Sequence, residues 1–117
     1  MRVSKFKGKD KAGNWHFGDV LHHDHGVVVI VDDAGKQHKI IPQTRCEFTG
    51  NYDCDGKEIF ESDIFTMKHG YPKNITFVVK YCGTAFLATP SNANYRSYTV
   101  DHFKNDCKVI GNIHDND

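Results

Sequence analysis

The sequence predicts a single all-β domain over residues 1–117, a small, partly open SH3-like barrel or a similar barrel-like domain with one minor helical turn. Short segments rich in β-branched and aromatic residues alternate with polar turns at intervals of about 8–12 residues, which is typical of sandwiches and small barrels. Eight Phe, five Tyr and one Trp supply the apolar bulk of one core. No long linker divides the chain, and its length suits one domain.

Two hairpins are predicted in the first half of the chain. Residues 27–31 are a run of β-branched residues that indicates a buried strand, and residues 32–35 follow as a hairpin turn. Gly18 and Asp19 predict a bend or bulge before residues 20–21, and Pro42 ends the strand at residues 37–41. The predicted strands are residues 2–7, 15–17, 20–21, 27–31 and 37–41, with a turn at residues 10–14.

The second half predicts a further hairpin and a short final strand. Cys82 and Gly83 separate two apolar segments and indicate the hairpin turn. Residues 90–96 are a polar loop, and residues 100–104 are expected to form one helical turn. The predicted strands are residues 64–68, 75–81, 85–88 and 109–113.

Two aspartates are predicted to act structurally where a strand begins. Asp19 and Asp63 each follow a turn glycine and an aromatic residue, and Gly56 is the turn glycine before Asp63. A carboxylate in such a place accepts hydrogen bonds from nearby backbone N–H groups. Glu58, Glu61 and Asp63 also offer three carboxylates within six positions, the material of a catalytic or metal site. Their interleaving with apolar residues favours a solvent-facing polar row instead.

Composition limits the function classes. Fifteen Lys and Arg balance 15 Asp and Glu, whereas proteins that attract nucleic acid non-specifically usually carry a positive excess. The N-terminus has no apolar leader and the chain has no run of about 18 apolar residues, so we expect a cytoplasmic protein that does not enter membranes. The four cysteines lack Cys-x-x-Cys spacing and are expected to be reduced thiols, with no cofactor.

Five ordered blocks, at residues 13–19, 41–44, 48–50, 55–64 and 109–116, together span nearly the whole chain. In this order they resemble the YopX family, small proteins of bacteriophages and prophages. The sequence departs from the family pattern at Gln43, Cys46 and Ser62. Ser62 replaces a usual glycine, which argues against a required positive φ there. The resemblance implies a barrel-like β-rich fold and a phage protein acting in the host cytoplasm, with no established reaction, cofactor or catalytic residue.

Alternating lysines make the N-terminal strand a candidate contact surface. In an extended strand they would all lie on one side. Such a row could bind nucleic acid, contact a complementary subunit, or protect an exposed strand edge. The lysines are Lys5, Lys7, Lys9 and Lys11.

Three loop tyrosines could stack on bases, fill a protein interface, or be buried by their neighbours. They are Tyr71, Tyr95 and Tyr98.

The histidines near residue 23 are a candidate metal site. In a strand, His23 and His25 would project from one face and could bind a transition metal together with a distant ligand. The neighbouring Gly26 favours a solvated turn instead. No nucleophile motif surrounds any cysteine, and no glycine-rich phosphate loop is found, so we expect a non-enzymatic protein.

These observations together predict a phage or prophage accessory protein that works by protein–protein contact. The partner is expected to be a host or phage protein, or a second copy of the chain in a homo-oligomer. The alternative is a nucleic-acid-binding module that uses the basic N-terminal strand and the tyrosines.

Overall fold

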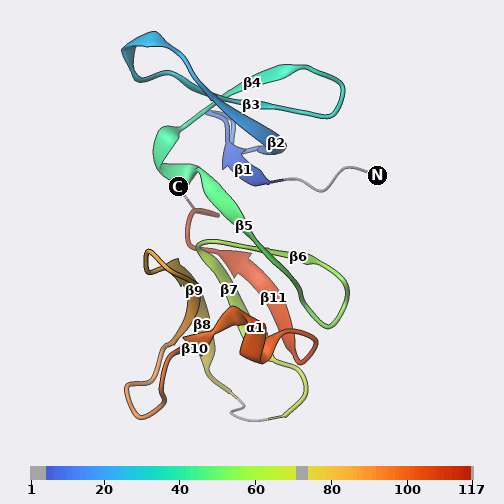
Figure 1. Ribbon diagram of the computed structural model, residues 1–117, viewed down its shortest axis with the longest axis vertical. Helices are drawn as coiled ribbons and strands as arrows, with labels where there is room; N and C mark the ends of the chain where they lie inside the picture. Colours follow the sequence, from blue (N-terminus) through green and yellow to red (C-terminus); the bar gives the residue numbers. More distant parts are fainter. Residues whose placement is uncertain (1–4, 71–73, 117) are drawn as a thin grey trace. The chain divides into compact units, whose positions relative to one another are not determined.

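The computed structural model describes residues 5–70 and 74–116, and in this part of the chain antiparallel strands predominate, which confirms the all-β prediction (Figure 1). One short helix, α1 (Val100–Phe103), forms at the predicted helical turn. Two 3-10 turns are η1 (Asp24–Gly26) and η2 (Pro42–Thr44). The strands are β1 (Phe6–Lys9), β2 (Trp15–His22), β3 (Val28–Val31), β4 (Gln37–Ile40), β5 (Cys46–Tyr52), β6 (Glu58–Phe60), β7 (Asp63–Met67), β8 (Thr76–Tyr81), β9 (Phe86–Pro90), β10 (Tyr98–Thr99) and β11 (Cys107–Asn112).

The contacts within the chain group into two compact units. The first unit ends at Phe48, and the second comprises Thr49–Asn116, so the chain passes from one to the other within β5. Hydrogen-bonded strands follow the orders β4-β3-β2-β1-β5-β6 and β10-β9-β8-β7-β11. The single domain over residues 1–117 stays a prediction.

In the first unit a four-stranded sheet curls back on itself. Strands β1 to β4 pair antiparallel in sequence order. Beyond the end of β4, the Ile41 N–H donates to the Lys9 carbonyl at 2.8 Å, and the Lys9 N–H donates to the Thr44 hydroxyl at 2.9 Å. The sheet is thus curved and partly open, and the SH3-like topology stays a prediction. Its core consists of Val28, Ile30 and Ile40, with Phe6 and Val20 against them.

Gly18 marks a change of pairing partner in β2. The strand runs unbroken from Trp15 to His22, so the predicted segments 15–17 and 20–21 form one strand rather than two, and the bend predicted at Gly18 and Asp19 stays a prediction. Gly18 pairs with Phe6 of β1, whereas Asp19 already pairs with Val31 of β3. A Cβ atom at Gly18 would overlap the Val31 carbonyl oxygen, so glycine allows β3 to approach at this point.

Three hairpins share one turn, Asp-x-x-Gly, at residues 10–13, 32–35 and 53–56. In each turn the aspartate Oδ1 accepts the N–H groups two and four positions later at 2.9–3.0 Å. The glycine N–H donates to the aspartate carbonyl, and the glycine φ lies between 81° and 89°, a conformation that favours glycine. The same local hydrogen bonds therefore build all three turns, including the one predicted at Gly56.

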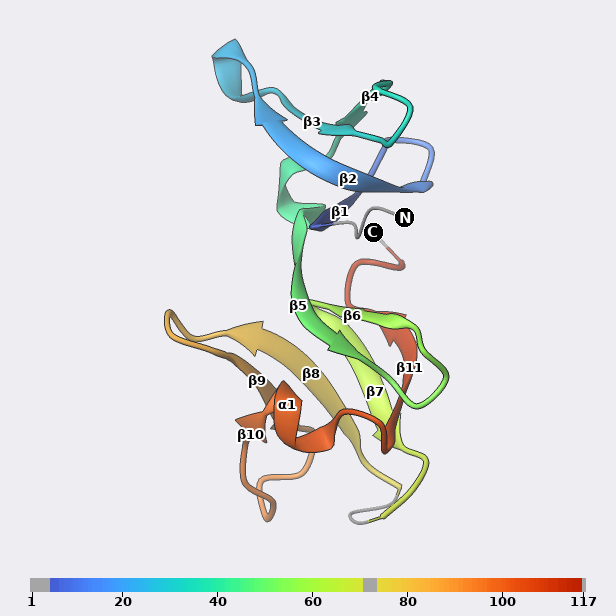
Figure 2. The ribbon, with the colours of Figure 1, turned by 45° about the vertical axis from the view of Figure 1, so that its right-hand side comes forward.

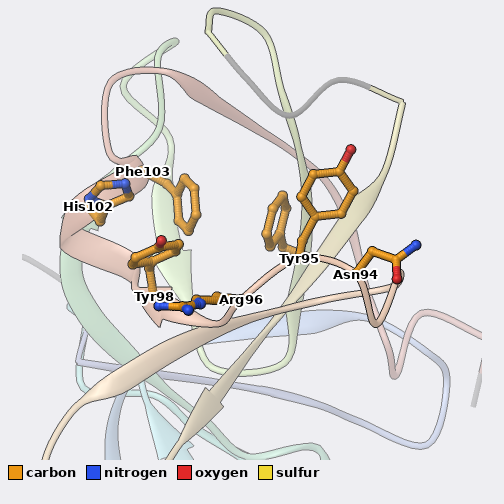
Figure 3. Close-up of a pocket in the computed structure, with 7 residues that line it drawn as sticks. Asn94, Tyr95, Arg96, Tyr98, His102 and Phe103 are labelled. Atoms are coloured by element: carbon orange, nitrogen blue, oxygen red, sulfur yellow. The ribbon is translucent and has the colours of Figure 1, made fainter.

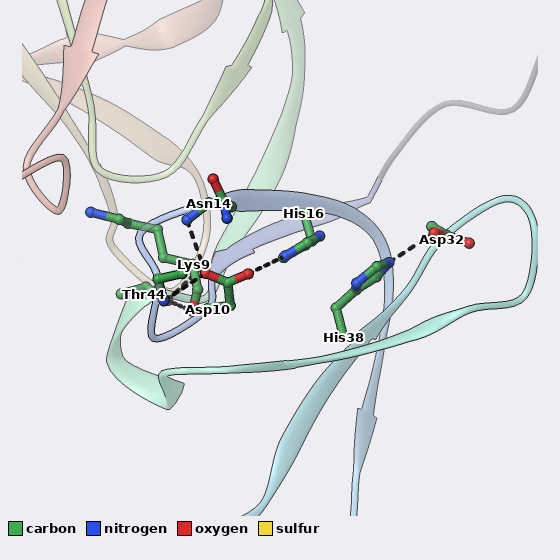
Figure 4. Close-up of polar contacts among 8 residues, drawn as sticks. Lys9, Asp10, Asn14, His16, Asp32, His38 and Thr44 are labelled. Carbon is green, nitrogen blue, oxygen red and sulfur yellow. Dashed lines mark hydrogen bonds and ion pairs between the residues drawn. The ribbon is translucent and has the colours of Figure 1, made fainter.

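The second oxygen of each turn aspartate binds a different group. The Asp10 and Asp32 Oδ2 atoms lie 2.8 Å from Nε2 of His16 and His38 respectively (Figure 4). The two imidazole rings stack with centroids 3.9 Å apart. In the third turn the Asp53 Oδ2 accepts the Val109 N–H at 3.0 Å, which ties the β5–β6 hairpin to β11.

The second unit encloses the larger core. Its sheet runs from β10 to β11, and α1 lies beside β9 and β10 (Figure 2). The rings of Phe65, Phe77 and Phe103 pack together with centroids 4.9–5.8 Å apart. The buried residues of this core are Ile59, Phe65, Phe77, Val79, Ala88, Val100, Phe103, Cys107 and Val109.

Asp63 begins β7 and is fully buried. The prediction that it belongs to a solvent-facing polar row is therefore wrong. Its Oδ2 accepts the Phe60 N–H at 2.8 Å, and its Oδ1 accepts a hydrogen bond from Asn112 Nδ2 at 2.9 Å. Ser62, just before it, has a φ of 70°. The expectation that a serine here would exclude a positive φ is therefore wrong. Asp19 lies inside β2 and is half-buried.

Candidate functional site

The N-terminal lysines do not form a continuous exposed row. Strand β1 pairs with β2 on one side and β5 on the other, so the alternative in which these lysines protect an exposed edge of β1 is wrong, and the other two alternatives stay predictions. Lys7 and Lys9 share one face, with their Nζ atoms 4.6 and 5.8 Å from the centroid of the Trp15 ring. Their side chains are only 7% and 2% exposed, whereas Lys5 and Lys11 are exposed. The buried pair serves cation–π packing in the first unit.

His25 lies in the exposed turn η1, and the exposed His23 directly precedes it. Residues 24–26 form a 3-10 turn rather than a strand, so the prediction that His23 and His25 project from one face of a strand is wrong. His23 Nε2 lies 3.1 Å from the Gln37 side-chain oxygen, and His25 has a φ of 62°. Over residues 5–70 and 74–116, no group of three or more His, Cys, Asp or Glu is placed to hold a metal ion.

Two of the predicted tyrosines meet at a cavity of about 380 Å³ in the second unit (Figure 3). Tyr95 and Tyr98 come from the segment between β9 and α1, and Tyr71 lies outside the described residues. We call this cavity the tyrosine pocket. Its lining residues are Phe77, Asn94, Tyr95, Arg96, Tyr98, His102 and Phe103.

The inner wall of the tyrosine pocket belongs to the hydrophobic core. Phe77 and Phe103 are 1% and 4% exposed, and their ring centroids lie 4.9 Å apart. Tyr98 meets the Phe103 ring edge-on at 5.9 Å and stacks on His102 at 4.6 Å. These ring contacts restrain the side chains that face the cavity, although Tyr98 keeps 44% of its surface exposed.

The loop that carries the outer wall is anchored at both ends. At its start, the Ser91 N–H donates to the Thr76 carbonyl at 2.8 Å, and the Thr76 N–H donates to the Ser91 hydroxyl at 3.2 Å. Within it, the Tyr95 N–H donates to the Asn92 carbonyl at 3.1 Å. At its end, β10 pairs with β9 through Tyr98 and Ala88. The anchored loop therefore presents Tyr95 and Arg96 from a hydrogen-bonded frame.

The charged groups at the tyrosine pocket favour a negative ligand. Arg96 carries a permanent positive charge. None of the described lining residues is an aspartate or glutamate, and the nearby Asp101 is paired with Lys104 at 3.0 Å. Aromatic faces and N–H donors together suit the binding of a flat or apolar group that has an acceptor beside it.

The sequence matches the family model for YopX protein over residues 4–117. The chain belongs to the YopX family. Among curated proteins, none matches the chain. In the described part of this YopX protein, no helix is long and apolar enough to span a membrane.

Arg96 and His102 are site residues of this YopX protein that the sequence analysis missed. The signal for His102 was its place in the predicted helical turn at residues 100–104, whereas Tyr98, on which it stacks, lies in β10. Arg96 had no comparable signal, because only the folded loop brings its side chain beside the aromatic core. Figure 3 shows Arg96 and Tyr98 next to each other at the cavity.

A second cavity of this YopX protein, about 510 Å³, lies in the first unit beside the β1–β2 turn. Lys11 and Lys39 are among its lining residues, together with Ile40, Ile41 and Pro42. Its lining includes no aromatic residue among those described, so the tyrosine pocket offers the richer set of recognition groups.

Proposed function

We propose that this YopX protein is a phage- or prophage-encoded accessory protein that works in the bacterial cytoplasm by binding another protein, without catalysis. We further propose that the tyrosine pocket is its recognition site. The supporting observation is that Tyr95, Arg96 and Tyr98 converge on a cavity with core phenylalanines behind it. Tyrosine and arginine are among the side chains that most often dominate the binding free energy of protein interfaces.

The exposed part of Tyr98 supports this role. Its ring is held by His102 and Phe103 and still exposes 44% of the residue. Burying a restrained aromatic ring in a partner costs little conformational entropy. The partner is a host or phage protein or a second copy of the chain, and sedimentation velocity over a range of concentrations distinguishes self-association from binding to another protein.

Capture from the host lysate tests the proposal. The tagged protein and its variants Tyr98→Ala and Arg96→Glu are compared by quantitative mass spectrometry, with Tyr81→Ala as the matched control. Tyr81 is 52% exposed in the same unit and is outside the tyrosine pocket. We expect a protein retained by the wild type and the control but depleted about 30-fold or more by both pocket variants, the loss for a residue worth about 2 kcal/mol. Equal capture by all four proteins would refute the proposal.

Nucleic-acid binding through the N-terminal strand is the weaker alternative, because Lys7 and Lys9 are buried against Trp15. Salt-dependent retention on DNA or RNA that is weakened by Lys5→Glu and Lys11→Glu would favour it.

A further inference from the structure

We infer that the tyrosine pocket accepts an aromatic side chain with a carboxylate beside it, so that the bound segment of the partner is an acidic peptide. This inference rests on the proposed function and specifies the chemistry of the partner.

The size of the cavity limits what it holds. A volume of about 380 Å³ lies near the lower end of the range of ligand pockets, about 300–1,000 Å³. It admits a single aromatic side chain with its backbone rather than a long segment. Phe77 and Phe103 are nearly fully buried and back the wall of the cavity, so the ring surface open to an incoming ring is that of Tyr98, which packs against Phe103 and is 44% exposed.

The charges select the group that accompanies the ring. The Arg96 guanidinium has a planar fork of donors that can bind both oxygens of a carboxylate. Since no carboxylate is among the described lining residues, an anionic group meets uncompensated positive charge there. A partner segment with a lysine at the same place would be repelled.

A peptide fits these charges better than a nucleic acid. A nucleic-acid strand is held by several phosphate contacts, and the tyrosine pocket supplies one permanent cation, Arg96. The next lysine along the chain, Lys104, is paired with Asp101. The formal net charge of the chain is zero, which provides no general attraction to phosphates.

Titrations with small probes, followed by the ¹H–¹⁵N spectrum, test the inference. The probes are N-acetyl-phenylalanine, its neutral amide and uridine 5′-monophosphate, at low salt. We expect N-acetyl-phenylalanine to shift the amide signals of residues 94–103 and to bind about fivefold more tightly than the amide, the size of one partly exposed charge contact. Arg96→Gln should reduce this preference to less than about twofold, whereas Lys80→Gln, which removes an exposed lysine elsewhere in the same unit, should preserve it.

Each contrary outcome overturns the inference in a different way. Equal binding of the acid and the amide shows that the pocket recognises a ring without charge selection, and the proposed function then survives. Tighter binding of uridine 5′-monophosphate than of N-acetyl-phenylalanine shows recognition of a base and phosphate rather than of an acidic peptide. If no probe shifts residues 94–103, the inference is wrong, and the capture experiment alone decides the proposed function.

Discussion

Replacing Asp63 by alanine should lower the free energy of unfolding of the second unit by about 3–7 kcal/mol. The carboxylate is fully buried and accepts hydrogen bonds from the Phe60 N–H at 2.8 Å and from Asn112 Nδ2 at 2.9 Å. Its removal takes this acceptor from two buried donors, and each such loss costs about 1–3 kcal/mol. The small cavity left by the substitution adds about 1 kcal/mol. Asp63→Asn should cost about half as much, because the amide oxygen can still accept one of the two hydrogen bonds.

Amide hydrogen exchange at Phe65 and Val79 measures this change, because both residues lie in the core of the second unit. Trp15 lies in the first unit, so urea unfolding followed by its fluorescence reports whether that unit is destabilised with the second. A matching shift would support the single domain predicted from the sequence. Asp101→Ala is the control, since its exposed pair with Lys104 is worth less than about 1 kcal/mol. A change below about 1 kcal/mol in Asp63→Ala would show that the buried carboxylate does not stabilise the start of β7.

Three further predictions concern single residues. Ser62→Gly should raise the free energy of unfolding by up to about 1 kcal/mol in urea titrations, because φ is 70° at this position; a decrease would contradict the strain argument. Iodoacetamide should modify Cys82 first, since the Thr84 backbone N–H lowers the pKa of this exposed thiol, while burial raises the pKa of Cys107 to about 12; peptide mass spectrometry over time identifies the order. The His16 hydrogen bond lowers the pKa of Asp10 from 3.8 to about 2, so its contribution to stability is complete above pH about 4 and disappears as the pH falls toward 2. Trp15 fluorescence in urea should show this decline, and Asp10→Asn should make it shallower; an unchanged profile would contradict the argument.

The sequence correctly predicted the elements that are determined by the conformational preferences of neighbouring residues. The β-branched run at residues 28–31, the hairpin turn that follows it and the turn at Val100–Phe103 all formed as expected. Strand β5 was missed because Gly50, with a φ of 87°, interrupts its pattern, and a glycine inside a segment argues against a strand. The Asp-x-x-Gly turns were visible in the sequence, but the second oxygen of Asp53 finds its partner at Val109, 56 residues later. No local pattern encodes such a partner.

The candidate site was predictable only in part, for the same reason. Alternation correctly placed Lys7 and Lys9 on one face, but their burial depends on Trp15 and on pairing along both edges of β1. The tyrosines at positions 95 and 98 were found because aromatic residues in a polar loop stand out. The cavity itself needed Phe77, which reaches the site from β8.

Because β11 lies at the end of the chain, the two units of this protein can complete their hydrogen bonds at different times during translation. Strand β11 completes the second unit: it pairs with β7, and its residues Val109 and Asn112 bind the carboxylates of Asp53 and Asp63. The sheet β1 to β4 needs no residue beyond Phe48 for its own pairing and can form while translation continues. Until residues 107–112 are synthesised, the buried acids of the nascent second half lack these partners. During that interval it is the half of the chain more exposed to chaperones and proteases.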